Sequence, residues 1–425
     1  MEIVAALAVG IVLALFLLVL FEPSLPYRSD VHELPVQSQP FVDYLSAIVN
    51  ARLVTTGETT VLNSGTAIYD AQLRDIKTAR RTVHMEVYLY LRGKVADAML
   101  AALEERARAG VAVRIIVDRI GSWSTPNSYF DALRRAGGKV LWYQPIAWYT
   151  LKRFNNRTHR DILVIDGEIG FIGGVGVADY WIERERPGCP WRDTAIRATG
   201  DLVRGLQTSF AENWLEASGE ILAKEAFSLE SVKPPAMPPA GTALGMVVNS
   251  SPSAGRSTRA RMLFQLLLAS ARETIEITSP YFLPDRSLMA ELMRAARRGV
   301  AVTVLTPGRF NNHPITRLAS RRRYGQLLEA GVGIHEYQPT MIHAKVLTVD
   351  GWWSVLGSTN FDSRSFGLND EVNVAVLDRD LGTRMQDDFR ADLANSVRVD
   401  LEEWRRRSLR EKLAAAVAQL IERQV

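Results

Sequence analysis

An internal repeat is the sequence feature that most constrains the fold. The run Gly-Val-Ala-Val occurs at residues 110–113 and again at 299–302, and Tyr-Gln-Pro follows at 143–145 and 337–339. Each copy lies in a stretch where predicted helices end at glycine and alternate with short strands rich in β-branched residues. A chain that repeats such a unit is predicted to fold into two similar α/β halves, each with helices around a largely parallel sheet.

The predicted elements follow the same order in both halves. In the first half we expect helices near 63–80, 94–109 and 128–136, and strands near 82–88 and 113–118 and leading to Tyr143. In the second half we expect helices near 259–272, 287–298 and 316–330, and strands near 274–278 and 302–305 and leading to Tyr337. The shared order predicts two pseudosymmetric halves, each an α/β/α sandwich.

The composition along the chain suggests where the halves begin and end. We place the first repeat at 61–224 and the second, with a C-terminal helix, at 246–425. A linker at 225–245 separates them, because its prolines oppose regular structure. These prolines are Pro234, Pro235, Pro238 and Pro239. Residues 27–60 are expected to form an irregular connector with one short helix near Phe41–Leu53.

Residues 1–26 are predicted to be a transmembrane anchor and its flank. Ile3 to Phe21 carry no charge and, as a helix, would span about 28 Å, close to the thickness of a hydrocarbon core. The start has Glu2 and no basic residue, and no small-residue cleavage site follows, which argues against a cleaved signal peptide. Arg28 follows the span, so the positive-inside rule favours a single-pass protein of the inner cell membrane with its catalytic part in the cytoplasm.

The charge and cysteine content argue against several classes of partner. The chain has 51 lysine and arginine residues and 47 aspartate and glutamate residues. Its net charge of +4 is too balanced to predict a nucleic-acid partner. Its single cysteine, Cys189, excludes an internal disulfide and a cysteine-rich metal site. None of its 6 histidines forms an H-x-x-x-H pair, so we expect neither a metal nor another cofactor.

A short segment of the second half carries the candidate chemistry. His343 and Lys345 are two residues apart on a predicted strand that ends at Asp350, so an imidazole and an ammonium face the same side. Ser358 and Asn360 follow the next apolar run and add a hydroxyl and an amide. Together these side chains form a set of donors for an oxyanion, with one group able to act as nucleophile or acid.

The first half carries an altered copy of this segment. His159 and Asp166 have the same spacing as the histidine and aspartate of the second copy. Asp161 stands in place of the lysine, and Gly176 in place of the asparagine. At about 4 Å and an effective dielectric constant of about 20, two unit charges interact by about 4 kcal/mol, so an anion in place of a cation weakens phosphate binding. Three nearby residues are candidates to compensate: Lys152, Arg157 and Arg160.

The pattern H-x-K-x4-D followed by G-S-x-N, and ending in N-x-E at Asn369 and Glu371, resembles the signature of the phospholipase D superfamily. Within it, residues 50–425 resemble the bacterial cardiolipin synthases. The matching segments are E-x-Y at 86–88, W-R-D-T at 191–194, S-P-Y-F-L-P-D at 279–285, R-R-R-Y at 321–324 and N-F-D-S-R-S-F at 360–366. The histidine usual after W-R-D-T is replaced by Ala195.

This resemblance implies two halves that share one active site, with no metal. One histidine attacks a phosphodiester and becomes a phosphohistidine, and the other protonates the leaving alcohol and later deprotonates the incoming one. The family assigns the nucleophile to His159 and the acid to His343. Family position pairs Asp193 with His159 and Glu371 with His343. Three residues are expected to hold the substrate phosphate: Lys345, Ser358 and Asn360.

Several other polar residues are expected to be structural. Asp166 and Asp350 end their strands before glycine, which is typical of turn residues. His84, His313 and His335 belong to no motif, so we expect them to support the fold rather than the chemistry.

Three functions stay open at this point. The first is a membrane-anchored phosphatidyltransferase that joins two phosphatidylglycerol molecules into cardiolipin and releases glycerol. The second is a phospholipase D-type hydrolase, in which water replaces the acceptor alcohol. The third is a catalytically weak lipid-binding or regulatory protein, which Asp161, Gly176 and Ala195 would explain. All three predict a phospholipid partner at a membrane, and none predicts an oligomeric state.

Overall fold

The computed structural model describes Gly10 and residues 34–145, 155–183, 190–222, 243–252, 258–409 and 411. Among these residues, no helix has the length and apolar character needed to cross a bilayer. The predicted anchor at 1–26 lies outside them apart from Gly10, as do most of the linker, Lys152, Cys189 and most of the predicted C-terminal helix.

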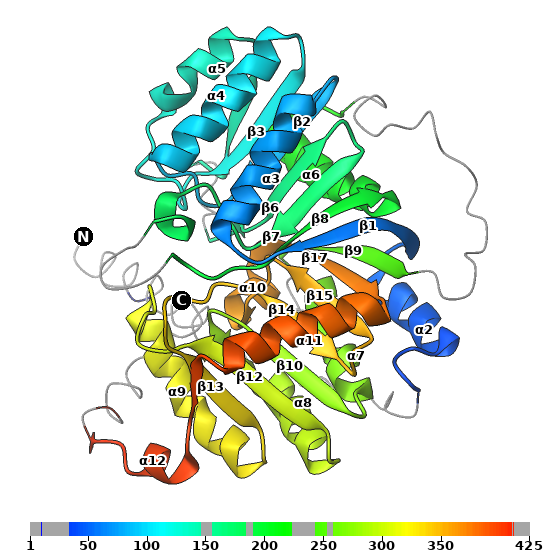
Figure 1. Ribbon diagram of the computed structural model, residues 1–425, viewed down its shortest axis with the longest axis vertical. Helices are drawn as coiled ribbons and strands as arrows, with labels where there is room; N and C mark the ends of the chain where they lie inside the picture. The colour runs from blue at the N-terminus through cyan, green and yellow to red at the C-terminus, as the bar shows by residue number, and fades with distance from the viewer. Residues whose placement is uncertain are drawn as a thin grey trace.

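The first half follows an N-terminal helix and strand (Figure 1). The N-terminal helix and strand are α2 (Gln39–Val49) and β1 (Val54–Leu62). The elements of the first half are α3 (Gly65–Thr78), β2 (Thr82–Val87), α4 (Lys94–Arg108), β3 (Ala112–Asp118), α5 (Asp131–Arg135), β4 (Lys139–Tyr143), β5 (Arg157–Thr158), β6 (Asp161–Ile165), β7 (Ile169–Gly173), β8 (Ala195–Gly200) and α6 (Asp201–Ser218). Two short 3-10 helices cover Asn127–Phe130 and Asp179–Trp181.

The second half repeats this order. Its elements are β9 (Leu244–Ser250), α7 (Arg259–Ser270), β10 (Thr274–Thr278), β11 (Phe282–Leu283), α8 (Arg286–Arg297), β12 (Ala301–Pro307), α9 (Pro314–Glu329), β13 (Gly333–Tyr337), β14 (Val346–Val349), β15 (Trp353–Gly357), β16 (Phe361–Asp362), α10 (Ser363–Gly367), β17 (Asn369–Leu377), α11 (Arg379–Leu393), β18 (Ser396–Arg398) and α12 (Leu401–Arg405). The predicted helices and strands of both repeats are present, with small shifts at their ends.

One mixed sheet runs through both halves in the described part of the chain. Its order is β18-β13-β12-β10-β14-β15-β17-β9-β1-β8-β7-β6-β2-β3-β4. Strands β2, β3 and β4 are parallel, as are β10, β12 and β13, but the strands between these two groups pair antiparallel. The prediction of a largely parallel sheet is therefore wrong. Hairpins such as β6–β7 and β14–β15 have short turns, which join only antiparallel neighbours.

The segment before the first repeat is more regular than predicted. It contains the expected short helix, as α2, but also β1, a strand that the sequence analysis missed. Strand β1 pairs with β8 of the first half and with β9 of the second, so it lies where the two halves meet (Figure 1). Helix α2 packs in the core of the second half, and the indole N–H of Trp353 donates to the carbonyl of Val36 at 2.7 Å.

Helix α6 covers the centre of the sheet. Its side chains at every fourth position, Leu202, Leu206, Phe210 and Trp214, are fully buried. They contribute to a core that includes Val374 of β17, a strand of the other half. Burying one side chain of this size contributes about 1.5–3 kcal/mol, so this helix face helps to hold the two halves in a fixed relationship.

Asp166 and Asp350 form the turns of the β6–β7 and β14–β15 hairpins. Both have positive φ angles, 54° and 52°. The carboxylate of Asp166 accepts the backbone N–H of Thr82 at 2.8 Å, and that of Asp350 accepts the N–H of Thr274 at 2.9 Å. Each carboxylate therefore ties a hairpin turn to the start of the neighbouring strand, at the end of the sheet away from the histidines.

Candidate active site

The two histidine segments meet at the junction of the halves. The backbone N–H of His159 donates to the carbonyl of Asp370 at 2.9 Å, and that of His343 donates to the carbonyl of Arg192 at 2.7 Å. Each histidine segment thus pairs with a segment of the opposite half. The residue that follows each acceptor carries a carboxylate, which the pairing brings next to the imidazole.

The carboxylates are exchanged between the halves. Nδ1 of His159 lies 3.1 Å from Oε1 of Glu371, and Nδ1 of His343 lies 3.0 Å from Oδ2 of Asp193. The predicted pairing, Asp193 with His159 and Glu371 with His343, is therefore wrong. It assumed that each half supplies its own partner, whereas the backbone pairing crosses between the halves.

Each carboxylate is held by further hydrogen bonds. Asp193 accepts the indole N–H of Trp181 at 3.0 Å and the backbone N–H of Thr194 at 2.8 Å. Glu371 accepts the amide N–H of Asn369 at 3.2 Å and the hydroxyl of Ser358. Both carboxylates are fully buried, and a fixed carboxylate sets the ring orientation and tautomer of its histidine.

Ser358 contacts the carboxylate of Glu371. Its hydroxyl donates to that carboxylate and accepts the backbone N–H of Val372 at 3.0 Å, and the residue is fully buried. In this structure the hydroxyl that was predicted to bind phosphate orients a carboxylate instead.

Lys345 lies against His343, with its ammonium 3.0 Å from Nδ1 of that ring and near several acidic groups. Its ammonium is 2.8 Å from the carbonyl oxygen of His343 and 3.2 Å from Nε2 of the same residue. Burial lowers the pKa of Lys345, and the charges of Asp193 and Asp161 oppose this effect. A Cβ atom on Gly174 would lie 2.7 Å from the ammonium, so this glycine of the first half leaves room for a lysine of the second. Gly174 was not predicted as a site residue, although the sequence has Gly-Gly at 173–174 where the second half has Gly-Ser.

Asp161 faces the same group of charges. Its Oδ1 accepts the backbone N–H of Tyr88 at 3.1 Å. Burial raises the pKa of Asp161 to about 6, against the opposing effects of His159 and Lys345. The carboxylate is therefore part of the site, where it competes with a bound phosphate for the cations.

The arginines proposed to compensate for Asp161 have other partners. Nη1 of Arg157 lies 3.7 Å from Oδ1 of Asp118. Nη1 of Arg160 donates to the carbonyl of Ser209 at 2.6 Å, and this arginine is fully buried. Arg160 alternates with His159 and Asp161 along the chain, so it faces the opposite side, whereas Arg157 shares their face. Compensation for Asp161 by these arginines stays a prediction.

Packing explains the glycine in place of the second asparagine. A Cβ atom on Gly176 would lie 2.7 Å from the carbonyl oxygen of Leu89, so an asparagine would require this backbone to move. Asn360, its counterpart, is 4 % exposed, and its Oδ1 has no hydrogen-bond partner among the described residues. Only the second half therefore supplies an asparagine amide at this position.

Aromatic rings surround both histidines. The ring of Tyr88 meets His159 edge-on at 5.1 Å, and the rings of Trp181 and Trp191 lie 5.6 and 5.5 Å from that of His343. Trp181 was not predicted as a site residue, because its position follows from the fold rather than from a motif. These rings exclude water from the imidazoles and strengthen the electrostatic interactions around them.

The two histidines differ in charge. Burial by itself lowers the pKa of His159, but the adjacent Glu371 carboxylate outweighs it, so the pKa lies above its ordinary value of 6.5. Burial and the Lys345 ammonium together lower the pKa of His343 to about 4, despite Asp193. Near neutral pH the site therefore contains one neutral imidazole and one that favours the protonated form.

The other histidines lie outside this pair. Nδ1 of His84 is 2.9 Å from Oε1 of Gln207, and its ring stacks on Phe210 at 4.7 Å. The ring of His313 contacts Tyr281, and His335 lies on β13. The buried contacts of His84 agree with a structural role, and the expectation that His313 and His335 support the fold stays a prediction.

Comparison with known proteins identifies the family. A family model described as cardiolipin synthase, PLD-like domain, matches residues 73–180 and 265–393. Cardiolipin synthase of Geobacillus kaustophilus (strain HTA426) is 32% identical over 365 residues, which cover 86% of this chain and 72% of that protein. Cardiolipin synthase A of Pseudomonas fluorescens is 34% identical over 362 residues, 85% of this chain and 74% of that protein.

A solved structure shows the same fold. Phosphatidylserine synthase of Haemophilus influenzae Rd KW20 aligns with a TM-score of 0.69 at 12% sequence identity, over 89% of this chain and 98% of that chain. The fold, the paired histidines and the sequence relatives agree with the resemblance found in the sequence. The chain belongs to the cardiolipin synthase family of phospholipase D-like proteins and is a phosphatidyltransferase of that superfamily.

Proposed function

We propose that the protein joins two phosphatidylglycerol molecules into cardiolipin and releases glycerol. The observation that carries this proposal is the pair of histidines, each hydrogen-bonded to a carboxylate of the opposite half, with Lys345 beside His343. The relatives named cardiolipin synthases support the choice of substrates.

In the first step, His343 acts as the nucleophile. Its Nδ1–H is donated to Asp193, so the lone pair is on Nε2, and the low pKa keeps the ring neutral. Nε2 attacks the phosphorus of one phosphatidylglycerol, a P–N bond forms and the bond to the glycerol oxygen breaks. Protonated His159 gives its proton to that oxygen, and glycerol leaves.

In the second step, a hydroxyl of another phosphatidylglycerol head group attacks the phosphohistidine. His159, now neutral, takes the hydroxyl proton, the P–N bond breaks and cardiolipin forms. The family resemblance assigns these roles in the opposite order. We reverse them because Lys345 disfavours a proton on His343, whereas Glu371 favours one on His159.

Lys345 and Asn360 are the proposed phosphate ligands. The ammonium lies 3.2 Å from Nε2 of His343. When phosphate binds, this hydrogen bond transfers to a phosphate oxygen, which frees the lone pair for attack. Hydrogen bonds to charged groups contribute about 1.5–3 kcal/mol each, so one lysine supplies part of the binding that two would give.

The proposed location is the inner cell membrane, with residues 1–26 as a single-pass anchor and the catalytic part in the cytoplasm. The uncharged stretch from Ile3 to Phe21 supports this arrangement. An anchored enzyme meets its lipid substrates in the plane of the bilayer, which suits a reaction that joins two lipids.

A lipid assay tests the function. The full chain in detergent is incubated with phosphatidylglycerol, and the products are measured by mass spectrometry beside His343→Ala and His159→Ala. We expect cardiolipin and glycerol from the wild type only. When the reaction is stopped early with a denaturant at neutral pH, because acid hydrolyses the P–N bond, we expect the phosphorylated peptide to contain residue 343. Phosphorylation of residue 159 instead would support the family's assignment, with His159 as the nucleophile and His343 as the acid.

Asp161 favours one alternative function. A carboxylate among the phosphate-binding groups opposes substrate binding, as expected of a weakly catalytic lipid-binding or regulatory protein. That alternative predicts no product from any variant, and it predicts that His343→Ala leaves the cellular role intact. Release of phosphatidic acid without cardiolipin would instead favour the hydrolase.

A further inference from the structure

A pocket of about 260 Å³ lies where the two halves meet, and none of its lining residues belongs to the active site. It is formed by the residues that follow α2, the first turns of α6, strand β9 and the start of α7. Figure 1 shows α2 at the right-hand edge of the molecule, beside β9 and α7. The pocket therefore involves elements of both halves.

Basic side chains dominate its unpaired charge. Arg52, Arg204 and Arg259 line the pocket, together with two acidic residues, Asp201 and Glu212. The acidic residues already have partners. Asp201 pairs with Arg204 at 3.1 Å. Glu212 accepts hydrogen bonds from Asn249 at 3.2 Å and from buried Arg160 at 3.3 Å.

Two of the arginines have no such partner. Within the part of the chain that the structure describes, Arg52 and Arg259 make no ion pair or side-chain hydrogen bond. A guanidinium presents a planar fork of donors that matches the oxygens of a phosphate. The two residues line the same pocket from different elements, Arg52 after α2 and Arg259 at the start of α7, so we infer that both can contact a single anion bound there.

The size of the pocket limits the ligand. Pockets for drug-sized ligands usually have volumes of about 300–1,000 Å³. A pocket of about 260 Å³ suits a phosphorylated head group. Asn50 and Thr208 also line it and provide hydrogen-bonding groups for hydroxyls.

We propose that this pocket binds a phosphate-bearing polar group of the size of glycerol phosphate, at a site separate from the active site. Such a group occurs both as a lipid head group and as a free phosphate ester. The exposed face of α2 bears Tyr44 and Ile48, which are 38% and 40% exposed and four residues apart on one side of the helix. This apolar pair lies on the last turns of α2, just before Asn50 of the pocket lining. Exposed apolar side chains beside the pocket favour a lipid as the source of the phosphate group.

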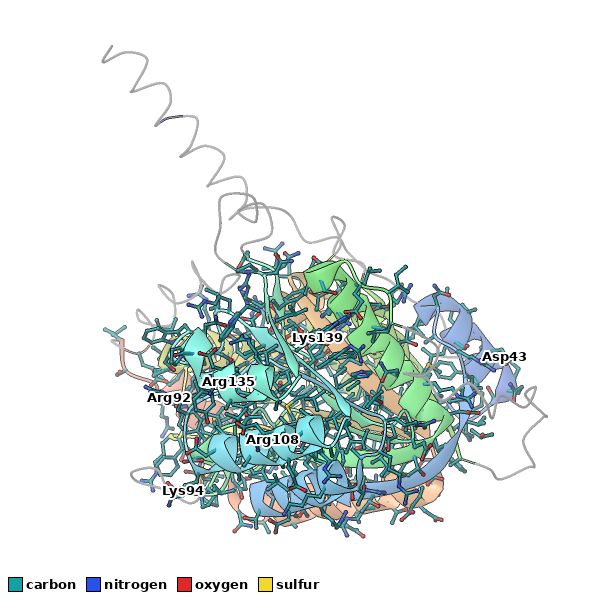
Figure 2. All side chains as sticks on the ribbon, turned by 90° about the horizontal axis from the view of Figure 1, so that it is seen from above. Asp43, Arg92, Lys94, Arg108, Arg135 and Lys139 are labelled. Carbon is teal, nitrogen blue, oxygen red and sulfur yellow. The ribbon has the colours of Figure 1, made fainter. Side chains whose placement is uncertain are left out.

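The first experiment measures binding of sn-glycerol 3-phosphate by calorimetry to the full chain in detergent. Lys345→Ala serves as the background, because it removes the charged one of the two proposed phosphate ligands of the active site. We expect binding to persist in this background, and to weaken roughly tenfold with Arg52→Gln and again with Arg259→Gln. Arg135→Gln is the matched control, an exposed arginine at the end of α5 on the opposite side of the molecule from α2 (Figure 2).

Each result decides the proposal. Complete loss of binding in the Lys345→Ala background would show that only the active site binds the ligand, and equal binding by the Arg52, Arg259 and Arg135 variants would also overturn it. Thermal melting of each variant shows whether it is folded. Because this readout needs no catalysis, the proposal can fail while cardiolipin synthesis succeeds, and the reverse.

A second experiment distinguishes the sources of the ligand. Hydrogen exchange is measured for the full chain in phosphatidylcholine nanodiscs, with and without phosphatidylglycerol. Slower exchange at residues 50–54 and 201–205 in the presence of phosphatidylglycerol, lost in Arg52→Gln/Arg259→Gln, supports a lipid head group. Slower exchange with glycerol phosphate alone supports a soluble ester. No protection by either ligand contradicts the proposal.

Discussion

Nδ1 of His343 lies 3.0 Å from Oδ2 of Asp193, a carboxylate of the opposite half of the chain. The reciprocal pair, His159 and Glu371, is 3.1 Å apart. Neither half therefore contains a complete histidine–carboxylate pair of its own. The correct ring orientation and charge of each imidazole depend on how the two halves pack, so catalysis is coupled to the integrity of the junction.

The Asp193→Asn variant tests the exchanged pairing. It removes the acceptor that fixes the tautomer of His343, and we expect kcat to fall by about 10²–10⁴-fold with little change in KM. A steady-state assay with phosphatidylglycerol measures both constants. In Glu371→Gln, by contrast, the loss should concern His159, whose NMR titration should move to lower pH. If Asp193→Asn moved the His159 titration instead, the pairing would be as first predicted from the sequence.

The pH profile tests the proposed roles of the histidines. The reaction needs His343 neutral and His159 protonated. Activity should therefore fall as the pH drops through about 4, where His343 becomes protonated, and again as the pH rises above the raised pKa of His159. Measuring kcat/KM from pH 3.5 to 9 checks both limbs. Removing the carboxylate in Glu371→Gln should move the alkaline limb to lower pH. If that limb did not move, the loss of activity at high pH would come from a group other than His159.

Asp161→Asn tests the carboxylate among the phosphate-binding groups. Above pH 6 Asp161 is ionised and repels the phosphodiester, whereas below pH 6 it is protonated. We expect the variant to lower KM for phosphatidylglycerol roughly tenfold at pH 8, and to converge with the wild type at pH 5. Glu168→Gln, in the exposed β6–β7 turn, is the control for a lost negative charge. A higher KM at every pH would show that Asp161 instead contributes a favourable contact.

Ser358→Ala separates two roles for one hydroxyl. If Ser358 only orients Glu371, as the hydrogen bond indicates, kcat should fall about tenfold while KM for phosphatidylglycerol stays within about twofold. The alkaline limb of the pH profile should also shift, because Glu371 determines the charge of His159. If the hydroxyl binds phosphate, as first predicted, KM should rise and the limb should stay in place. Ser354→Ala, a buried serine of β15, controls for lost packing.

The sequence by itself determined the family, the two-fold repeat and most of the helices and strands. These features depend on local patterns: helices that end at glycine, runs of β-branched residues, and an aspartate before glycine at two hairpin turns. It also identified both histidines, Lys345 and both carboxylates, because each belongs to a short motif. Their convergence was expected from the family resemblance, which implies that the two halves share one active site.

Only the tertiary structure decided how these residues are paired. The partner of His343 lies 150 residues away and that of His159 lies 212 residues away, and no local pattern encodes which carboxylate reaches which ring. The same holds for β1 between the halves and for Gly174 beside Lys345. Each depends on backbone pairing and close packing between distant segments, which exist only once the two halves have folded against one another.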